Sequence, residues 1–160
     1  MADQQVTIKA VPEKRLLSVR ALLPPGASIP AHFEAVMAGF QHFQNWEKFG
    51  PCVAYYYGDP AAGMEVEIGF LAPDDYADSF TLTGGEVASI HTAPAMPAAA
   101  CLIHRGGYSA IGQSWEALMG WIVANGYVMS GPCCEVYLND PDRVPEADLL
   151  TELQQPIQKA

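Results

Sequence analysis

Apolar and polar positions along the chain follow two different periods. Strict alternation, as in MEVEIGFL at residues 64–71, is typical of a β-strand with one buried face. In residues 29–48 and 111–125, apolar side chains instead recur every three or four positions, which predicts two amphipathic helices. Further stretches with strand-like composition lie at 6–11, 15–23, 52–57, 87–92, 98–105, 133–138 and 149–157.

The predicted elements occur twice in the same order. GPCVAYYYGDP at 50–60 and GPCCEVYLNDP at 131–141 agree at Gly, Pro, Cys, Tyr, Asp and Pro. Upstream, IPAHFEAVMAGF aligns with IGQSWEALMGWI, which sets Phe33 opposite Trp115. This internal repeat predicts two modules, at about 5–72 and 86–157, joined by an acidic, turn-rich segment.

At 160 residues, half of them apolar, the chain is long enough for one well-buried core and too short for two ordinary domains. We therefore expect a single α+β domain with an antiparallel sheet and two helices on one face. The repeat implies pseudo-twofold symmetry. The groove between the symmetry-related helices is then the natural concave site.

Charge narrows the choice of partners. Lys and Arg number 8 against 18 Asp and Glu, which gives a formal net charge of -10 without any basic cluster. This balance argues against direct binding of nucleic acid and favours cations. The N-terminus lacks a signal-peptide pattern, and no apolar run approaches the roughly 20 residues of a membrane span. We expect a cytoplasmic protein.

Motifs for metals, cofactors and nucleophilic catalysis are missing from the sequence. The four cysteines lack CxxC spacing, so we expect reduced structural thiols. The four histidines lack metal-ligand spacing, and no GxSxG, Walker or dinucleotide pattern appears. We expect no metal and no cofactor, and leave a Cys101–His104 nucleophile pair as a minor alternative.

Carboxylates within two predicted strands raise a question about their surroundings. Glu135 shares a strand face with Tyr137, and its counterpart in the first copy is Ala54. Glu135 lies either on a solvated face or in a pocket, and the pattern leaves both open. Glu65 and Glu67 alternate with apolar residues, so a solvated face is the leading interpretation, with Glu67 in the cleft as the alternative.

The stretches HRGGYSAIGQSWEALMGWIVANGY and GPCCEVYLNDPDRVPEADLLTELQQPI resemble the GyrI-like small-molecule-binding domains, the effector-binding domains of multidrug-sensing regulators. The resemblance rests on a Gly-Tyr before the second helix, an aromatic on it, Asn-Gly at its end, and then Gly-Pro, Glu-x-Tyr and Asp-Pro. It implies two β-α-β-β modules with a cleft between them. Two departures are Gly106-Gly107-Tyr108 in place of Gly-Pro-Tyr, and no room for a helix-turn-helix before the first strand near Val6. We therefore do not expect direct transcriptional control.

The resemblance also implies the ligand class and its residues. Family members bind lipophilic, often cationic, aromatic compounds, and the recurrent cleft glutamate corresponds to Glu135, with Tyr137 beside it. Such rings can stack on flat ligands and attract cations. We rank Tyr137, Trp115 and Tyr108 highest as ligand-binding rings, followed by Tyr56 and Phe33. Three consecutive tyrosines, 55 to 57, must divide between the two faces of their strand.

Three functional hypotheses follow. The first is a stand-alone protein that binds such compounds. The second is a hydrolase, because some stand-alone members resemble enzymes that open cyclopropane rings in reactive natural products. In it Glu135, with Glu67 or Tyr108, would activate water. The third is a subunit that reports ligand binding to a separate regulator.

Overall fold

The computed structural model describes residues 5–44, 46–59 and 62–160 of the chain. The chain divides into two compact units, each described by itself below. Unit 1 comprises Met1–Pro12 and Ala95–Ala160, and unit 2 comprises Glu13–Pro94. The chain therefore passes from one unit to the other twice, at two of the prolines that interrupt the strand-like stretches.

Unit 2 is an antiparallel sheet with one helix. Its strands are β2 (Lys14–Leu23), β3 (Cys52–Asp59), β4 (Gly63–Leu71), β5 (Phe80–Thr81) and β6 (Val87–Ala93), and its helix is α1 (Ile29–Gly39). They pair in the order β3-β4-β2-β6-β5. Apolar residues of β4 such as Phe70 face α1, where the ring of Phe70 meets that of Phe40 at 5.3 Å.

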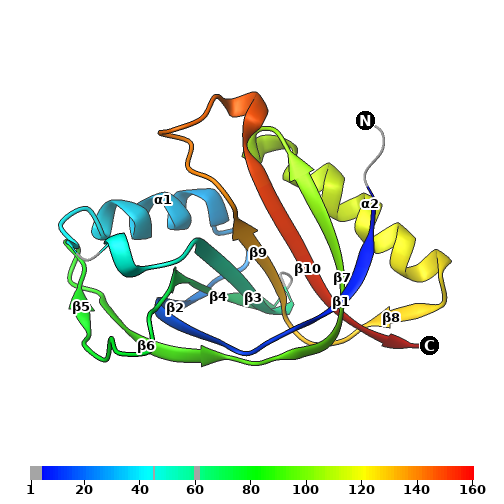
Figure 1. Cartoon of the computed structure of the whole chain (residues 1–160), viewed down its shortest axis with the longest axis horizontal. Helices are drawn as coiled ribbons and strands as arrows, with labels where there is room; N and C mark the ends of the chain where they lie inside the picture. The colour runs from blue at the N-terminus through cyan, green and yellow to red at the C-terminus, as the bar shows by residue number, and fades with distance from the viewer. Residues whose placement is uncertain (1–4, 45, 60–61) are drawn as a thin grey trace. The chain divides into compact units, whose positions relative to one another are not determined.

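Unit 1 repeats this arrangement. Its strands are β1 (Thr7–Val11), β7 (Met96–Arg105), β8 (Tyr127–Met129), β9 (Cys133–Tyr137) and β10 (Leu150–Lys159), and its helix is α2 (Ile111–Ala124). They pair antiparallel in the order β1-β7-β10-β9, with the short β8 beside the end of β10. Each helix runs along the strands of its own unit (Figure 1). The α+β fold with antiparallel pairing and two α-helices among the described residues confirms the expected class.

The compact units differ from the sequence repeats in their first strands. β1, which begins the first repeat, pairs with β7 in unit 1. β6, which begins the second repeat, pairs with β2 in unit 2. The repeats predicted at about 5–72 and 86–157 therefore exchange their first strands. Each unit is built from residues of both repeats.

The helix predicted for 29–48 is too long at its C-terminal end. α1 begins after the N-cap Ser28, whose hydroxyl accepts from Ala31 N–H, and ends at Gly39. There the carbonyl of Gly39 accepts a hydrogen bond of 3.1 Å from the backbone N–H of Thr83. The helix carbonyl is therefore satisfied by another segment. A short 3₁₀ turn, Trp46–Lys48, follows separately.

The two units have different cores. In unit 2, aromatic rings pack with centroids 4.5 to 6.2 Å apart; the rings are Phe40, Phe43, Trp46, Phe49, Phe70, Tyr76 and Phe80. In unit 1, aliphatic residues of α2, β7 and β10 form the core, with Leu118, Ile122 and Leu153 fully buried. Among the described residues, no helix is both long and apolar enough to cross a membrane.

Candidate functional site

Glu135 is a buried carboxylate on the helix-bearing side of the unit 1 sheet. It lies in β9 directly across from Leu153 of β10, which packs against α2. Its neighbours Cys134 and Val136 point to the other side of the strand and are buried as well. Glu135 itself is only 7% exposed, so the solvated-face alternative is excluded.

Two aromatic side chains donate hydrogen bonds to this carboxylate, one to each oxygen. Trp115 Nε1–H, from α2, lies 2.7 Å from Oε2. The Tyr137 hydroxyl lies 2.6 Å from Oε1. Tyr137 is two residues along the same strand, so both side chains point to one face. The sequence spacing therefore accounts for the contact between Tyr137 and Glu135, whereas packing of α2 on the sheet brings Trp115 within hydrogen-bonding distance of Glu135.

Both donors are neutral, so they orient the carboxylate without cancelling its charge. A hydrogen bond to a charged group contributes about 1.5–3 kcal/mol, and a buried carboxylate costs several kcal/mol unless it is compensated. The charge of Glu135 also acts on Cys133. Burial first, and then the Glu135 charge, raise the pKa of the Cys133 thiol to about 11.

Tyr108 joins this group from the segment before α2. Its ring meets that of Tyr137 edge-on, with centroids 5.6 Å apart. Tyr108 is about one-third exposed, at 38%, and lies in a 3₁₀ turn that runs directly into α2. Gly106, with φ at +116°, provides the left-handed turn that leads to this segment. Gly107, which stands where the family pattern has proline, has a φ of -65° that proline could also adopt.

His104 and Ser114 hold this segment in place, a role that the sequence did not predict for either residue. The His104 ring, which is buried, contacts the Gly107 carbonyl through Nε2 at 2.9 Å and the Ser114 hydroxyl through Nδ1 at 2.7 Å. A carbonyl only accepts, so Nε2 carries a hydrogen, and in the neutral ring Nδ1 then accepts from the Ser114 hydroxyl. His104 thus ties the Tyr108 turn and the start of α2 to β7. No spacing rule in the sequence joins these three residues.

Phe33 and Tyr56 occupy the corresponding side of unit 2. Tyr56 of β3 lies across from Val66, on the face that α1 covers, and is half-buried. Phe33 is a half-buried residue of α1 itself. Tyr55 and Tyr57 point to the opposite face, where their rings stack with centroids 6.4 Å apart. The three tyrosines therefore divide between the faces as predicted.

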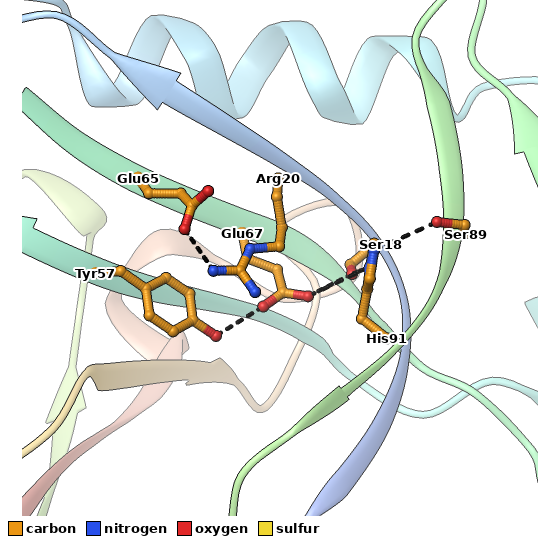
Figure 2. A network of polar contacts seen from close by, with 7 residues as sticks. All are labelled: Ser18, Arg20, Tyr57, Glu65, Glu67, Ser89 and His91. Carbon is orange, nitrogen blue, oxygen red and sulfur yellow. Dashed lines mark hydrogen bonds and ion pairs between the residues drawn. The ribbon is translucent and has the colours of Figure 1, made fainter.

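Glu67 lies on the face with Tyr55 and Tyr57 and is 1% exposed, so the solvated interpretation is wrong for this residue. Its Oε1 accepts from the Tyr57 hydroxyl at 2.8 Å, and its Oε2 accepts from the Ser18 hydroxyl at 2.6 Å (Figure 2). Glu65 does lie at the surface, paired with Arg20. The alternating pattern correctly put Glu65 and Glu67 on one face of the strand. It did not show that this face is buried at Glu67 and partly exposed at Glu65.

The structure thus brings together Glu135, Trp115, Tyr137 and Tyr108 in unit 1. The other predicted residues, Glu67, Tyr56 and Phe33, belong to unit 2, and Glu67 and Tyr56 lie on opposite faces of its sheet. Glu135 faces α2, whereas Glu67 points away from α1, so the two carboxylates occupy non-equivalent positions in their units.

Metal binding and a cysteine nucleophile find no support in the part of the chain that the structure describes. Within it, no group of three or more His, Cys, Asp or Glu side chains could hold a metal ion. The four cysteines are thiols, as expected. Cys101 and His104 are three residues apart on β7, so they point to opposite faces, and the minor Cys–His alternative is wrong.

Comparison with known proteins places the chain among small-molecule-binding domains. A family model described as "GyrI-like small molecule binding domain" matches residues 4–158. A search of curated proteins finds no match.

Solved structures share the fold. The EcmrR C-terminal domain aligns over 98% of this chain and 99% of its own length, with 24% identity and a TM-score of 0.67. The EcmrR chain in a complex with DNA gives the same score, with 58% of its length covered. A hydrolase from Listeria innocua aligns over 96% of this chain and 92% of its own, with 13% identity and a TM-score of 0.60. At these low sequence identities, the structural similarity establishes a shared fold and nothing about activity.

Proposed function

Since the chain belongs to the GyrI-like small-molecule-binding domain family, we propose that it binds lipophilic aromatic, often cationic, small molecules, with Glu135 as the counter-ion. In this proposal the ligand binds beside the Glu135 carboxylate of unit 1, at the rings that surround it. Tyr137, Trp115 and Tyr108 act with Glu135. Tyr56 and Phe33 remain candidate ligand-binding residues of unit 2, whereas Glu67, on the opposite face of that sheet from Tyr56, is not part of this site.

One observation carries the proposal: a carboxylate that is 7% exposed is held by the polar edges of two aromatic side chains. Because the Trp115 N–H and the Tyr137 hydroxyl are already directed at Glu135, these rings are fixed in orientation before a ligand arrives. Fixed rings lose little conformational entropy on binding. A cation near a tryptophan or tyrosine face gains about 0.5–2 kcal/mol in addition to its attraction to the carboxylate.

A structurally similar protein supports the ligand class. The protein SAV2435, in its structure bound to tetraphenylphosphonium, aligns over 96% of this chain with 14% identity and a TM-score of 0.58. Tetraphenylphosphonium is a lipophilic aromatic cation whose charge cannot be lost as a proton. It is therefore a suitable probe for a site that recognises charge and rings without a detailed shape.

The test compares a charged and a neutral probe. Glu135→Gln is expected to weaken binding of tetraphenylphosphonium about tenfold or more, which is about 1.4 kcal/mol, and binding of neutral triphenylphosphine oxide by less than about threefold. Calorimetry or fluorescence titration measures both. Glu116→Gln is the matched control, because Glu116 is exposed on α2 of the same unit, and it should change neither affinity. Equal losses for the two probes would remove the Glu135 charge from recognition.

Hydrolysis is a second candidate function. It is favoured by the hydrogen bond between Tyr137 and Glu135, which sets a phenol beside a buried carboxylate, and by the hydrolase from Listeria innocua among the similar structures. Glu135 would take a proton from water while the oxygen adds to a strained, cyclopropane-type aromatic compound, and the opened ring would accept a proton. Mass spectrometry should then detect product one water heavier, in excess of one equivalent. If product formation stops at one equivalent, the protein binds such compounds but does not turn them over.

Location and partners complete the proposal. We place the protein in the cytoplasm, acting without nucleic acid, and consider a separate regulator a further partner. The acidic sequence, with its net charge of -10, argues against nucleic acid as a partner. A pull-down with and without tetraphenylphosphonium tests the regulator, and a partner that does not depend on ligand would count against it.

A further inference from the structure

A row of hydrogen bonds in unit 2 leads from a partly exposed histidine to the buried carboxylate of Glu67 (Figure 2). The His91 side chain, on β6, is 36% exposed, and its Nδ1 lies 2.8 Å from the Ser18 hydroxyl. That hydroxyl lies 2.6 Å from Glu67 Oε2. His91 Nδ1 itself is 3.6 Å from the same oxygen, so Ser18 provides the shorter connection.

The direction of each hydrogen bond follows from the chemistry of the groups. An ionised carboxylate can only accept, so the single hydrogen of the Ser18 hydroxyl points to Glu67. Ser18 Oγ must then accept from His91, which assigns the hydrogen of the neutral imidazole to Nδ1. His104 in unit 1 has the opposite assignment, because its Nε2 donates to the Gly107 carbonyl.

We propose that His91, Ser18 and Glu67 form a proton relay that makes Glu67 a second acid–base site, separate from Glu135. A proton from solvent adds to His91 Nε2. The Nδ1 proton then passes to Ser18 Oγ as the Ser18 proton passes to Glu67 Oε2. The net change is one proton moved from solvent to Glu67, with His91 and Ser18 neutral at the end. The reverse sequence releases it.

The other oxygen of Glu67 connects the relay to Tyr57. The hydroxyl of Tyr57, which is half-buried, donates to Oε1, and the Arg20 guanidinium lies 4.3 Å from the centre of the Tyr57 ring. Arg20 pairs with Glu65, so its principal carboxylate partner is not Glu67. Lys14 also lies on this face, over the ring of Tyr55. The site suits a small molecule with an O–H or N–H group that exchanges a proton beside Tyr57.

Unit 1 has residues at the positions equivalent to Glu67 and His91, but they do not form a relay. By strand register, Glu152 of β10 corresponds to Glu67, and Lys9 of β1 corresponds to His91. Lys9 Nζ binds Glu152 directly at 2.8 Å. The hydrogen bond that Lys9 donates to Glu152 raises the pKa of Lys9, so this ammonium remains a fixed cation. Of these two equivalent positions, the one in unit 2 has an imidazole, with a donor and an acceptor nitrogen, and a hydroxyl between that imidazole and the carboxylate.

The experiment determines the imidazole tautomers of His91 and His104 in the full-length protein. Long-range ¹H–¹⁵N NMR at pH 8 should show His91 with its hydrogen on Nδ1 and His104 with its hydrogen on Nε2. Ser18→Ala should remove the Nδ1–H preference of His91. Ser89→Ala is the matched control, because Ser89 Oγ lies 3.4 Å from the opposite nitrogen, Nε2, and it should leave the preference intact.

A His91 ring with its hydrogen on Nε2 at pH 8 would overturn the relay, and so would an Nδ1–H preference that survives Ser18→Ala. The wild-type spectrum decides even if Ser18→Ala does not fold. The relay goes beyond the proposed function, since binding a fixed cation needs no proton transfer. The spectrum needs no ligand, so failure of the relay and failure of tetraphenylphosphonium binding are separate results.

Discussion

At the scale of single residues, Glu135 influences its neighbour Cys133 through charge. Burial and the Glu135 charge raise the pKa of this thiol from 9.0 to about 11. A thiol whose pKa is raised by folding stabilises the folded state at pH values below 9. This contribution is lost between pH 9 and about 11, because the unfolded chain releases the proton first.

We therefore expect the difference in unfolding free energy between wild type and Cys133→Ala to be constant below pH 9. It should then shrink by roughly 2–3 kcal/mol as the pH rises to 11. Urea unfolding at several pH values measures it. The Cys133→Ala protein itself provides the control for other groups that titrate in this range. A difference that does not depend on pH would contradict the raised pKa.

The sequence identified the important carboxylates better than their partners. Glu135 and Tyr137 share a strand face by spacing alone, and their contact was predictable. Ser18 and His91, however, are 73 residues apart and meet only because β2 and β6 pair. Hydrogen bonds between such distant residues follow from strand pairing, which a local pattern does not specify.

At the scale of elements, Gly69 of β4 permits the close packing of β2 onto β4. A Cβ at this position would lie 2.2 Å from the Leu17 carbonyl oxygen and 2.7 Å from Ser18 Cα, both backbone atoms that cannot move alone. Alternation in MEVEIGFL predicted the strand but not this constraint, because the sequence does not show how near the neighbouring backbone comes.

Gly69→Ala is expected to lower the free energy of unfolding by about 2 kcal/mol or more, in the range of overpacked sites. Gly112→Ala, in α2 with open space around its Cβ, should raise it by about 0.5–1 kcal/mol. Thermal and urea unfolding of the two variants provide the comparison. A destabilisation of similar size in both would show that loss of glycine itself, and not the contact, is responsible.

At the scale of the whole molecule, each repeat supplies the first strand of the other repeat's compact unit. Deleting residues 1–11 removes β1, and with it Thr7, Ile8 and Lys9, which are the strand partners of β7. We expect faster hydrogen exchange at β7 and across residues 95–160, with residues 13–94 much less affected, because β1 pairs within unit 1.

Hydrogen exchange with mass spectrometry resolves the two units in one measurement. Lys9→Ala is a milder control, which removes the ion pair with Glu152 and keeps the strand. It should change exchange little, since partly exposed ion pairs contribute about 0–1 kcal/mol. Equal acceleration in both units after the deletion would contradict a local role for β1.

Local pattern was sufficient for several properties of this protein. Periods of two and of three to four residues predicted the principal strands and α2, the internal repeat predicted two similar modules, and Glu-x-Tyr in β9 predicted a carboxylate beside a phenol. The periods and the Glu-x-Tyr spacing depend on residues within a few positions of one another. The repeat follows from comparing two stretches of the sequence and needs no knowledge of the contacts between them.

Tertiary structure decided the rest. Only pairing and packing showed that β1 and β6 change places, that α1 ends where Thr83 meets Gly39, that Trp115 completes the Glu135 group, and that Glu67 is buried. Each depends on contacts between residues far apart in the chain. An alternating pattern specifies which side chains share a face, but it does not specify what covers that face.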